Sequence, residues 1–220
     1  KIKPPYTPDA IAGAIAASRE RLGGAPIELL YLHQWSHELV NPASLAALDA
    51  AIRRGEVNAM GASNLNTNQL GALLALQEQD GLSPLQVLQN NHNFAVRDVD
   101  APLLELCAHA GMALVTYSPL GAGFLTGKHR NGVEPGSRFD VVPGHQKVYF
   151  NPLAWDRLAR LETVSQRTGH SLPSMALAWA LNQPGPRTVL VGGRSPTQIE
   201  QALNALALGR PDWLDDLEEK

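Results

Sequence analysis

The regular alternation of short apolar runs with amphipathic segments constrains the fold of this chain more than any other feature. Five apolar runs are predicted strands: Leu29–Leu32, Val57–Gly61, Gln86–Gln89, Met112–Thr116 and Thr188–Val191. Other segments repeat apolar residues at helical spacing, and the predicted helices are Pro8–Leu22, Asn41–Arg54, Asn66–Gln79, Asp100–Ala110, Asn151–Thr168, Ser171–Leu181 and Ser195–Leu208. Helices between strands return the chain to the start of the sheet, so the pattern predicts parallel strands.

The same pattern favours a TIM barrel of the (β/α)8 type over an open dinucleotide-binding sheet. No Gly-x-Gly-x-x-Gly turn follows an early strand, as it would in a Rossmann domain. Eight strand–helix units usually need about 250 residues, whereas this chain of 220 residues carries five. We therefore expect a single, partial α/β barrel domain over residues 1–220, with about five of the eight units. Because an incomplete barrel leaves strand edges uncovered, residues 1–220 alone are predicted not to form a stable monomer.

Composition excludes several classes of function. A net charge of −3, without a block of Lys and Arg, gives no reason to expect nucleic acid. No apolar run approaches the about 18 residues that suggest a membrane helix. The one cysteine, Cys107, lies in a helical pattern and is interpreted as a buried core thiol rather than a nucleophile. A reducing, cytoplasmic setting fits this cysteine usage, and no metal site is predicted.

Polar residues follow the first three strands, at the ends where barrel enzymes carry their active sites. His33 follows the first strand, where a neutral imidazole can orient a carbonyl oxygen, although a lone histidine is more often structural. Ser63 and Asn64 follow the second strand, where they can hold a neutral amide ligand or cap the next helix. Gln89 ends the third strand, and its amide can pair with a carboxamide or lie in a polar loop.

The run Gly111–Lys128 combines a buried strand with a loop of small residues that ends in a cation. Tyr117 offers a ring that can stack on a flat heterocycle, and the loop can bring backbone N–H groups and Lys128 to a phosphate. An ordinary turn at the barrel rim is the alternative. The segment Ser118–Asn151 is rich in Gly and Pro and too long for a plain connection, which is typical of functional loops.

The last strand is followed by a second segment that suits a phosphate. Gly192 and Gly193 allow close approach of backbone N–H groups, Arg194 adds a guanidinium, and a helix begins directly afterwards. A simple turn with a helix cap would have the same composition. The acidic tail Pro211–Lys220 is predicted to be exposed, or docked through Trp213.

Taken together, these residues resemble the aldo-keto reductase family. The segments that carry the resemblance are Leu29–His33, Gly61–Asn64, Gln89 with His92 and Asn93, Tyr117–Lys128, and Val191–Gln198. They span essentially the whole chain in the family's order and spacing. The resemblance implies an oxidoreductase that uses NADPH/NADP and reduces aldehydes or ketones to alcohols by hydride transfer, with a small-molecule carbonyl compound as its partner.

The resemblance also implies a role for individual residues. His33 corresponds to the active-site histidine, and Lys1, which lies 32 residues earlier, is the plausible catalytic lysine, with Lys3 as second choice. Residues implied to hold the nicotinamide are Ser63, Asn64, Gln89 and Tyr117. Residues implied to line the ribose and phosphates are Ser118, Leu120, Gly123, Lys128, Gly192, Arg194 and Gln198. Arg194 favours NADPH over NADH, since a 2′-phosphate needs a cation partner.

The chain departs from the family in one respect that leaves alternatives open. The family's catalytic Asp and Tyr precede its Lys, on strand–helix units that this chain does not carry, and neither Tyr6 nor Tyr31 takes the place of that Tyr. The chain is therefore interpreted as a reductase lacking roughly its first three strands, or as a non-catalytic nucleotide- or partner-binding relative. A third alternative is a phosphate-binding isomerase or aldolase that uses Lys128 or Lys147. The carbonyl substrate and any homo-oligomer stay open.

Overall fold

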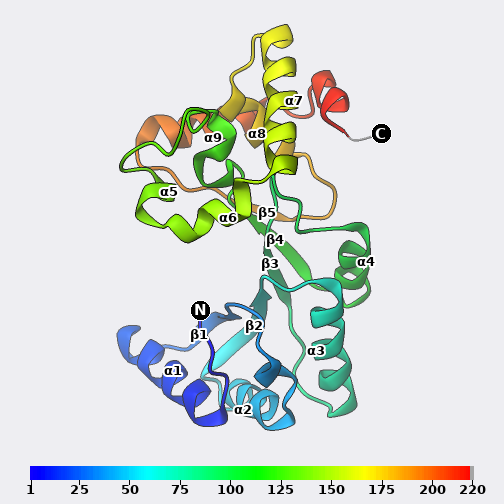
Figure 1. Cartoon of the computed structure of the whole chain (residues 1–220). Helices are drawn as coiled ribbons and strands as arrows, with labels where there is room; N and C mark the ends of the chain where they lie inside the picture. Colours follow the sequence, from blue (N-terminus) through cyan, green and yellow to red (C-terminus); the bar gives the residue numbers. More distant parts are fainter. Residues whose placement is uncertain (219–220) are drawn as a thin grey trace. The chain divides into compact units, whose positions relative to one another are not determined.

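The computed structural model describes residues 1–218, whose helices and strands are labelled in Figure 1. Contacts divide the chain into two compact units, which we describe separately. Unit 1 comprises Lys1–Asn90 and Val99–Val115, and unit 2 comprises Asn91–Asp98 and Thr116–Lys220. Strands β3 (Val87–Asn91) and β4 (Ala113–Tyr117) begin in unit 1 and end in unit 2. The prediction of one domain over residues 1–220 is not decided by this division.

Five strands form one sheet in sequential order. The other three strands are β1 (Ile27–Leu32), β2 (Val57–Ser63) and β5 (Thr188–Leu190), and hydrogen bonds give the order β1-β2-β3-β4-β5. Pairing is parallel between β1 and β2 and between β2 and β3, with Tyr31 opposite Gly61 and Gly61 opposite Val87. Sequential order of parallel strands joined by helices is the arrangement within a (β/α) barrel, so the predicted fold class is confirmed.

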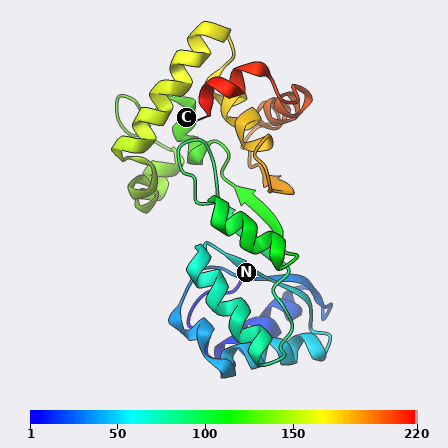
Figure 2. The ribbon, with the colours of Figure 1, turned by 90° about the vertical axis from the view of Figure 1, so that its right-hand side faces the viewer.

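Four α-helices complete unit 1, and their starts follow local sequence signals. They are α1 (Pro8–Arg21), α2 (Pro42–Arg53), α3 (Thr67–Gln79) and α4 (Ala101–His109), and a one-turn helix η1 (His37–Val40) precedes α2. Each α-helix begins after a residue whose side chain accepts a hydrogen bond from a first-turn N–H: Thr7, Asn41, Asn66 and Asp100. Helices α3 and α4 contact each other, and Figure 2 shows both from the right-hand side of Figure 1.

The core of unit 1 lies between the strands and these helices. Strand residues Leu30, Leu32, Met60 and Leu88 are buried together with helix residues, among them Leu45, Leu48, Leu73 and Leu103. Cys107 belongs to this core at 3% exposure, and burial raises the pKa of its thiol to about 11. The interpretation of Cys107 as a buried core thiol is therefore confirmed.

Unit 2 contains the long segment after β4 and the C-terminal helices. Its elements are η2 (Gly121–Thr126), α5 (Arg138–Val141), η3 (Pro143–His145), α6 (Gln146–Tyr149), α7 (Pro152–Thr168), α8 (Leu172–Leu181), β5, α9 (Pro196–Ala207) and η4 (Asp212–Leu217). Aromatic residues fill its core, with the ring of Phe124 4.5 Å from that of Trp155 and the ring of Phe139 5.7 Å from that of Tyr149. The segment Ser118–Asn151 thus contains short helices that pack around a cluster of aromatic side chains, and it is not an open loop.

The C-terminal tail docks on unit 2 through Trp213, which is the second of the two alternatives predicted for it. Helix η4 packs against α7, and Trp213 is 8% exposed with its ring 5.5 Å from that of His170. The last two tail residues, Glu219 and Lys220, lie outside the described residues. Between residues 1 and 218, no helix has the length and apolar character needed to cross a membrane.

Candidate active site

The residues predicted from the sequence fall into two sets, one in each unit. In unit 1 they gather around the ends of β1 and β2, and we call this set, with Tyr31 added, the strand-end cluster: Lys1, Tyr31, His33, Ser63, Asn64 and Gln89. Ser63 is the last residue of β2 rather than the first after it, and it pairs with Gln89, which lies two residues before the end of β3 rather than at its end. In unit 2 they lie on the loop after β4 and the turn after β5: Tyr117, Ser118, Leu120, Gly123, Lys128, Gly192, Arg194 and Gln198. Each set is described by itself.

Lys1 is brought into the strand-end cluster by pairing of the first residues with β1. Ile2 forms a parallel bridge with Leu32, its N–H donates to the carbonyl of Tyr31 at 2.9 Å, and its carbonyl accepts from the N–H of His33 at 2.9 Å. The ammonium of Lys1 donates to Oε1 of Gln89 and lies 5.3 Å from the centre of the Tyr31 ring. Burial lowers the pKa of the Lys1 side chain, so this cation sits in a partly desolvated position.

His33 follows β1 as predicted, and its surroundings favour the neutral form of its ring. Burial is the largest cause that lowers the pKa of His33, and the charges of Lys1, Lys3 and the terminal amino group act in the same direction. Its Nδ1 is buried and has no hydrogen-bond partner among the described residues. A buried polar atom without a hydrogen bond costs free energy, so the ring is a candidate for contact with a ligand that supplies this bond.

Ser63 and Asn64 join the ends of the three strands rather than capping the next helix. The Ser63 hydroxyl donates to the carbonyl of Gln89 at 2.8 Å. Asn64 has a φ of 61°, its N–H donates to the Gln89 carbonyl at 3.1 Å, and its Nδ2 donates to the His33 carbonyl at 3.0 Å. The capping alternative is wrong, because Asn66 caps α3 through reciprocal bonds with Gln69 of 2.9 and 3.0 Å.

Sequence reasoning missed two residues of this region. Asn90 accepts at Oδ1 from the N–H of Asn64 at 2.9 Å and of Leu65 at 3.3 Å, and so fixes the turn after β2. Tyr31 lies under the ammonium of Lys1, near the end of β1 and two residues before His33, which follows that strand. The alternation of side chains along a strand could have placed Tyr31 and His33 on one face.

None of the four tyrosines has the lowered pKa that a proton-donating tyrosine beside a lysine would need. Burial raises the pKa of Tyr6, Tyr31 and Tyr149, and it raises that of Tyr117 to about 12. For Tyr31 a hydrogen bond from Gln89 acts in the opposite direction but is the smaller cause. The strand-end cluster therefore offers a cation, an imidazole and amides, and its tyrosine, Tyr31, has a pKa that burial raises.

The loop after β4 turns sharply and presents Lys128. Ser118 has a φ of 57°, its carbonyl accepts from the N–H of Gly121 at 2.8 Å, and Gly123 has a φ of 98°. A Cβ on Gly123 would meet only the Lys128 side chain at 3.5 Å and His129 at 3.9 Å. Tyr117 ends β4, and Leu120 packs on the core of unit 2. Lys128 lies at the end of this loop, where its ammonium pairs with Glu134 at 2.8 Å.

The turn after β5 places Arg194 next to a helix start. The N–H of Arg194 donates to Oε1 of Gln198 at 2.7 Å, so Gln198 closes the turn, and Ser195 makes no capping bond with its side chain. The guanidinium of Arg194 donates to the carbonyl of Gly136 at 3.2 Å. Gly192 is exposed with no neighbour that a Cβ would meet. No group of three or more His, Cys, Asp or Glu side chains that could hold a metal occurs within residues 1–218.

Comparison with known proteins connects this geometry to a family. The model of the aldo/keto reductase family matches residues 1–212. The chain is 29% identical over 214 residues to the aldo-keto reductase dtxS3 of Metarhizium robertsii, covering 94% of this chain and 57% of that protein. It is 28% identical over 213 residues to the NADH-specific methylglyoxal reductase of Escherichia coli, covering 94% and 62%. It is 26% identical over 201 residues to an L-glyceraldehyde 3-phosphate reductase of Escherichia coli, covering 89% and 58%.

The chain thus spans 57–62% of the length of these curated relatives. The family match runs through both units and through every segment in which the predicted site residues lie. Together with the sequential sheet, it establishes that the chain belongs to the aldo/keto reductase family.

Proposed function

We propose that this chain is the nucleotide-binding and carbonyl-orienting part of an NADPH-dependent reductase of aldehydes or ketones. The observation that carries the proposal is the strand-end cluster, in which Nδ1 of His33 is buried without a partner, Asn64 donates to the His33 carbonyl and Lys1 donates to Gln89. Family membership and the reductases among its relatives support it. We further propose that both units belong to one barrel domain and that the protein is cytoplasmic.

The cluster residues have chemically distinct tasks in this proposal. His33 stays neutral near pH 7 and donates a hydrogen bond to the carbonyl oxygen of the substrate, which orients and polarises it. Lys1 contributes positive charge in a partly desolvated place, where it favours the developing alkoxide. Ser63, Asn64 and Gln89 form a rigid group of amides and hydroxyl for the nicotinamide carboxamide, and Gln89 exchanges its present bond with Lys1 to do so.

The residues of unit 2 suit the remaining parts of the nucleotide. Tyr117 provides an aromatic face, while Ser118, Leu120 and Gly123 shape a loop with close backbone approach. Lys128 and Arg194, with Gly192 and Gln198, provide cations and a helix start for the phosphates. The bound cofactor supplies the hydride. Arg194 is the residue on which the preference for NADPH depends, because a guanidinium pairs with a 2′-phosphate.

Nucleotide binding to the chain tests the proposal directly. We expect titrations followed by calorimetry to give tighter binding of NADPH than of NADH. Arg194→Gln should weaken NADPH binding about tenfold, since charge-assisted hydrogen bonds are lost, with a much smaller effect on NADH. The matched control is Arg187→Gln, an exposed arginine just before β5. Equal affinity for NADPH and NADH in the unsubstituted chain would refute the cofactor preference.

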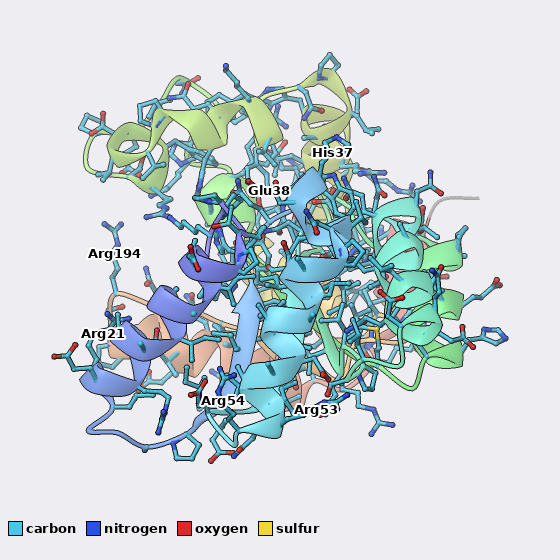
Figure 3. The ribbon with its side chains drawn as sticks, turned by 90° about the horizontal axis from the view of Figure 1, so that it is seen from below. Arg21, His37, Glu38, Arg53, Arg54 and Arg194 are labelled. Carbon is cyan, nitrogen blue, oxygen red and sulfur yellow. The ribbon has the colours of Figure 1, made fainter. Side chains whose placement is uncertain are left out.

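Turnover tests the second half of the proposal and separates it from a non-catalytic binding protein. That alternative is favoured by the strand-end cluster, in which Tyr31 lies with its ring centre 5.3 Å from the Lys1 ammonium and burial raises its pKa. Oxidation of NADPH with a panel of aldehydes should be slowed more by His33→Asn than by the control His37→Asn. His37 is exposed on η1, near the start of α2, whereas Arg53 and Arg54 lie at the other end of that helix (Figure 3). Binding without any oxidation would establish the non-catalytic alternative.

A further inference from the structure

Glu134 already pairs with Lys128, one of the two cations that the proposed function assigns to the nucleotide phosphates, and its charge also acts on the other, Arg194. Its Oε2 lies 2.8 Å from the ammonium of Lys128. The hydrogen bond from Lys128 is the largest cause that lowers the pKa of Glu134, and the charges of Lys128, His129 and Arg194 lower it further. A carboxylate and a phosphate use the same charge-assisted hydrogen bonds to cations. The Glu134 carboxylate therefore lies where the proposed function expects a phosphate, on the ammonium of Lys128.

The backbone around Glu134 is fastened on both sides, and we call the segment Gly132–Gly136 the acidic strap. The N–H of Glu134 donates to Nδ1 of His129 at 3.3 Å, and His129 is 2% exposed. At the other end, the carbonyl of Gly136 accepts from Arg194 at 3.2 Å, and the N–H of Gly136 donates to Asp140 at 2.7 Å. The strap thus joins the loop after β4 to the turn after β5, with one attachment at Glu134 itself and the other at Gly136.

The position of Glu134 is fixed by the backbone, whereas its side chain can leave the cation. The Lys128 side chain is 33% exposed and that of Glu134 52%, so water can separate the pair without disturbing the core of unit 2. Arg194 is exposed, and Figure 3 shows its side chain extending away from the ribbon. A second ion pair of the same loop, Arg130 with Glu162, involves neither of the two cations and provides an internal comparison.

We propose that Glu134 is a specificity-determining residue that holds Lys128, beside the Gly136 carbonyl to which Arg194 is bonded, until a nucleotide phosphate displaces it. The inference rests on the proposed function, which assigns both cations to the phosphates. Each phosphate charge near Arg194 either repels the carboxylate or must move it, so Glu134 opposes the binding of nucleotides that carry the additional 2′-phosphate. Arg194 and Glu134 then act in opposite directions on the choice between NADPH and NADH.

Adenosine 2′,5′-bisphosphate and AMP are the probes that test this proposal, because they differ only in the 2′-phosphate. Glu134→Gln removes the charge and keeps the shape. We expect it to tighten bisphosphate binding about three- to fivefold at low salt, the range of an exposed ion pair, and AMP binding less. The gain should fade at about 1 M salt because the charges are screened. Glu162→Gln, the matched control, should leave both affinities unchanged.

The outcomes separate this inference from the proposed function. The gain from Glu134→Gln should become smaller in a chain that also carries Lys128→Met, since the ammonium that the carboxylate releases is then absent while its repulsion of a phosphate near Arg194 persists. If bisphosphate binds but Glu134→Gln leaves its affinity unchanged or weakens it, the inference is overturned and nucleotide binding stands. If neither probe nor NADPH binds to any variant, the proposed function fails, and the assignment of the two cations to phosphates fails with it.

Discussion

Replacing Gly61 by alanine should destabilise the chain, because β2 has no room for a side chain there. A Cβ on Gly61 would lie 2.8 Å from Cε1 of Tyr31 and 2.9 Å from the carbonyl oxygen of Val87. Gly61 is paired with Tyr31 on one side and with Val87 on the other. The tyrosine ring can shift, but the carbonyl belongs to the backbone of β3 and can move only if the pairing of two strands changes.

The expected magnitude follows from two opposing effects. Overpacking of this kind costs about 1–3 kcal/mol, while alanine restricts the unfolded chain and returns about 0.4–1 kcal/mol. We therefore expect Gly61→Ala to lower the free energy of unfolding by about 1.3 kcal/mol, the middle of a range from about 0 to 2.6 kcal/mol. Urea titrations followed by far-UV circular dichroism, with linear extrapolation, measure this difference.

The matched substitution is Gly71→Ala in α3. A Cβ there would meet only Cδ2 of Leu106, at an ordinary 3.9 Å. Since glycine destabilises a helix interior relative to alanine, Gly71→Ala should raise the free energy of unfolding by about 0.5–1 kcal/mol. A Gly61→Ala chain as stable as the Gly71→Ala chain would refute the reasoning. The space around Gly61 would then have to be larger than its distances to Tyr31 and Val87 indicate.

Three further predictions concern other parts of unit 1. Asp49 accepts from the N–H and hydroxyl of Ser83 at 2.9 and 2.7 Å, and these bonds hold its pKa below the usual value. Asp49→Asn should therefore cost about 1–3 kcal/mol near pH 7. The difference from the unsubstituted chain should shrink as pH falls below about 4, where the unfolded state takes up its proton first; a difference independent of pH would contradict this. Cys107 should resist a thiol reagent at about pH 8 in the folded chain and react fully in denaturant, as counted by mass spectrometry. Asn66→Ala should lower the free energy of unfolding by about 1 kcal/mol in urea titrations through loss of the cap of α3; an unchanged midpoint would contradict it.

Local signals predicted most of the secondary structure. Thr7 with Pro8 and Asn41 with Pro42 mark the starts of α1 and α2, because a capping side chain and a proline at the first helical position act within a few residues. Strands β1 to β4 lie within two residues of the predicted runs, since their burial needs continuous apolar stretches. These features depend on neighbours in the sequence, which is why the sequence alone reveals them.

The helices α5 and α6 could not be predicted in the same way. Each has only four residues, too few to display a helical period, and isolated helices of that length are unstable in water. They form because Phe139 and Tyr149 reach the aromatic centre of unit 2, with Phe139 buried to 0% and Tyr149 to 3% exposure. That centre exists only in the folded chain.

The candidate site shows the same limit. The position of His33 after a strand was readable, but the bond between Lys1 and Gln89 joins residues 88 apart in the chain. Likewise, Ser63 and Asn64 looked equally suited to capping and to ligand binding, and only the partners Gln89 and His33 decide that they tie strand ends together. The roles assigned to these residues toward a nucleotide remain predictions.

Unit 1 is built from two separate stretches of the chain, and this affects when it can fold during synthesis. Residues Val99–Val115 supply α4 and the first part of β4, and Leu103, Cys107, Met112 and Leu114 belong to the same core as β1 and β2. A nascent chain that has emerged only as far as Asn90 therefore holds an unfinished core. Because chains emerge from the ribosome from the N-terminus onward, unit 1 can close only after α4 has left the exit tunnel, and until then its apolar helix faces are open to chaperones.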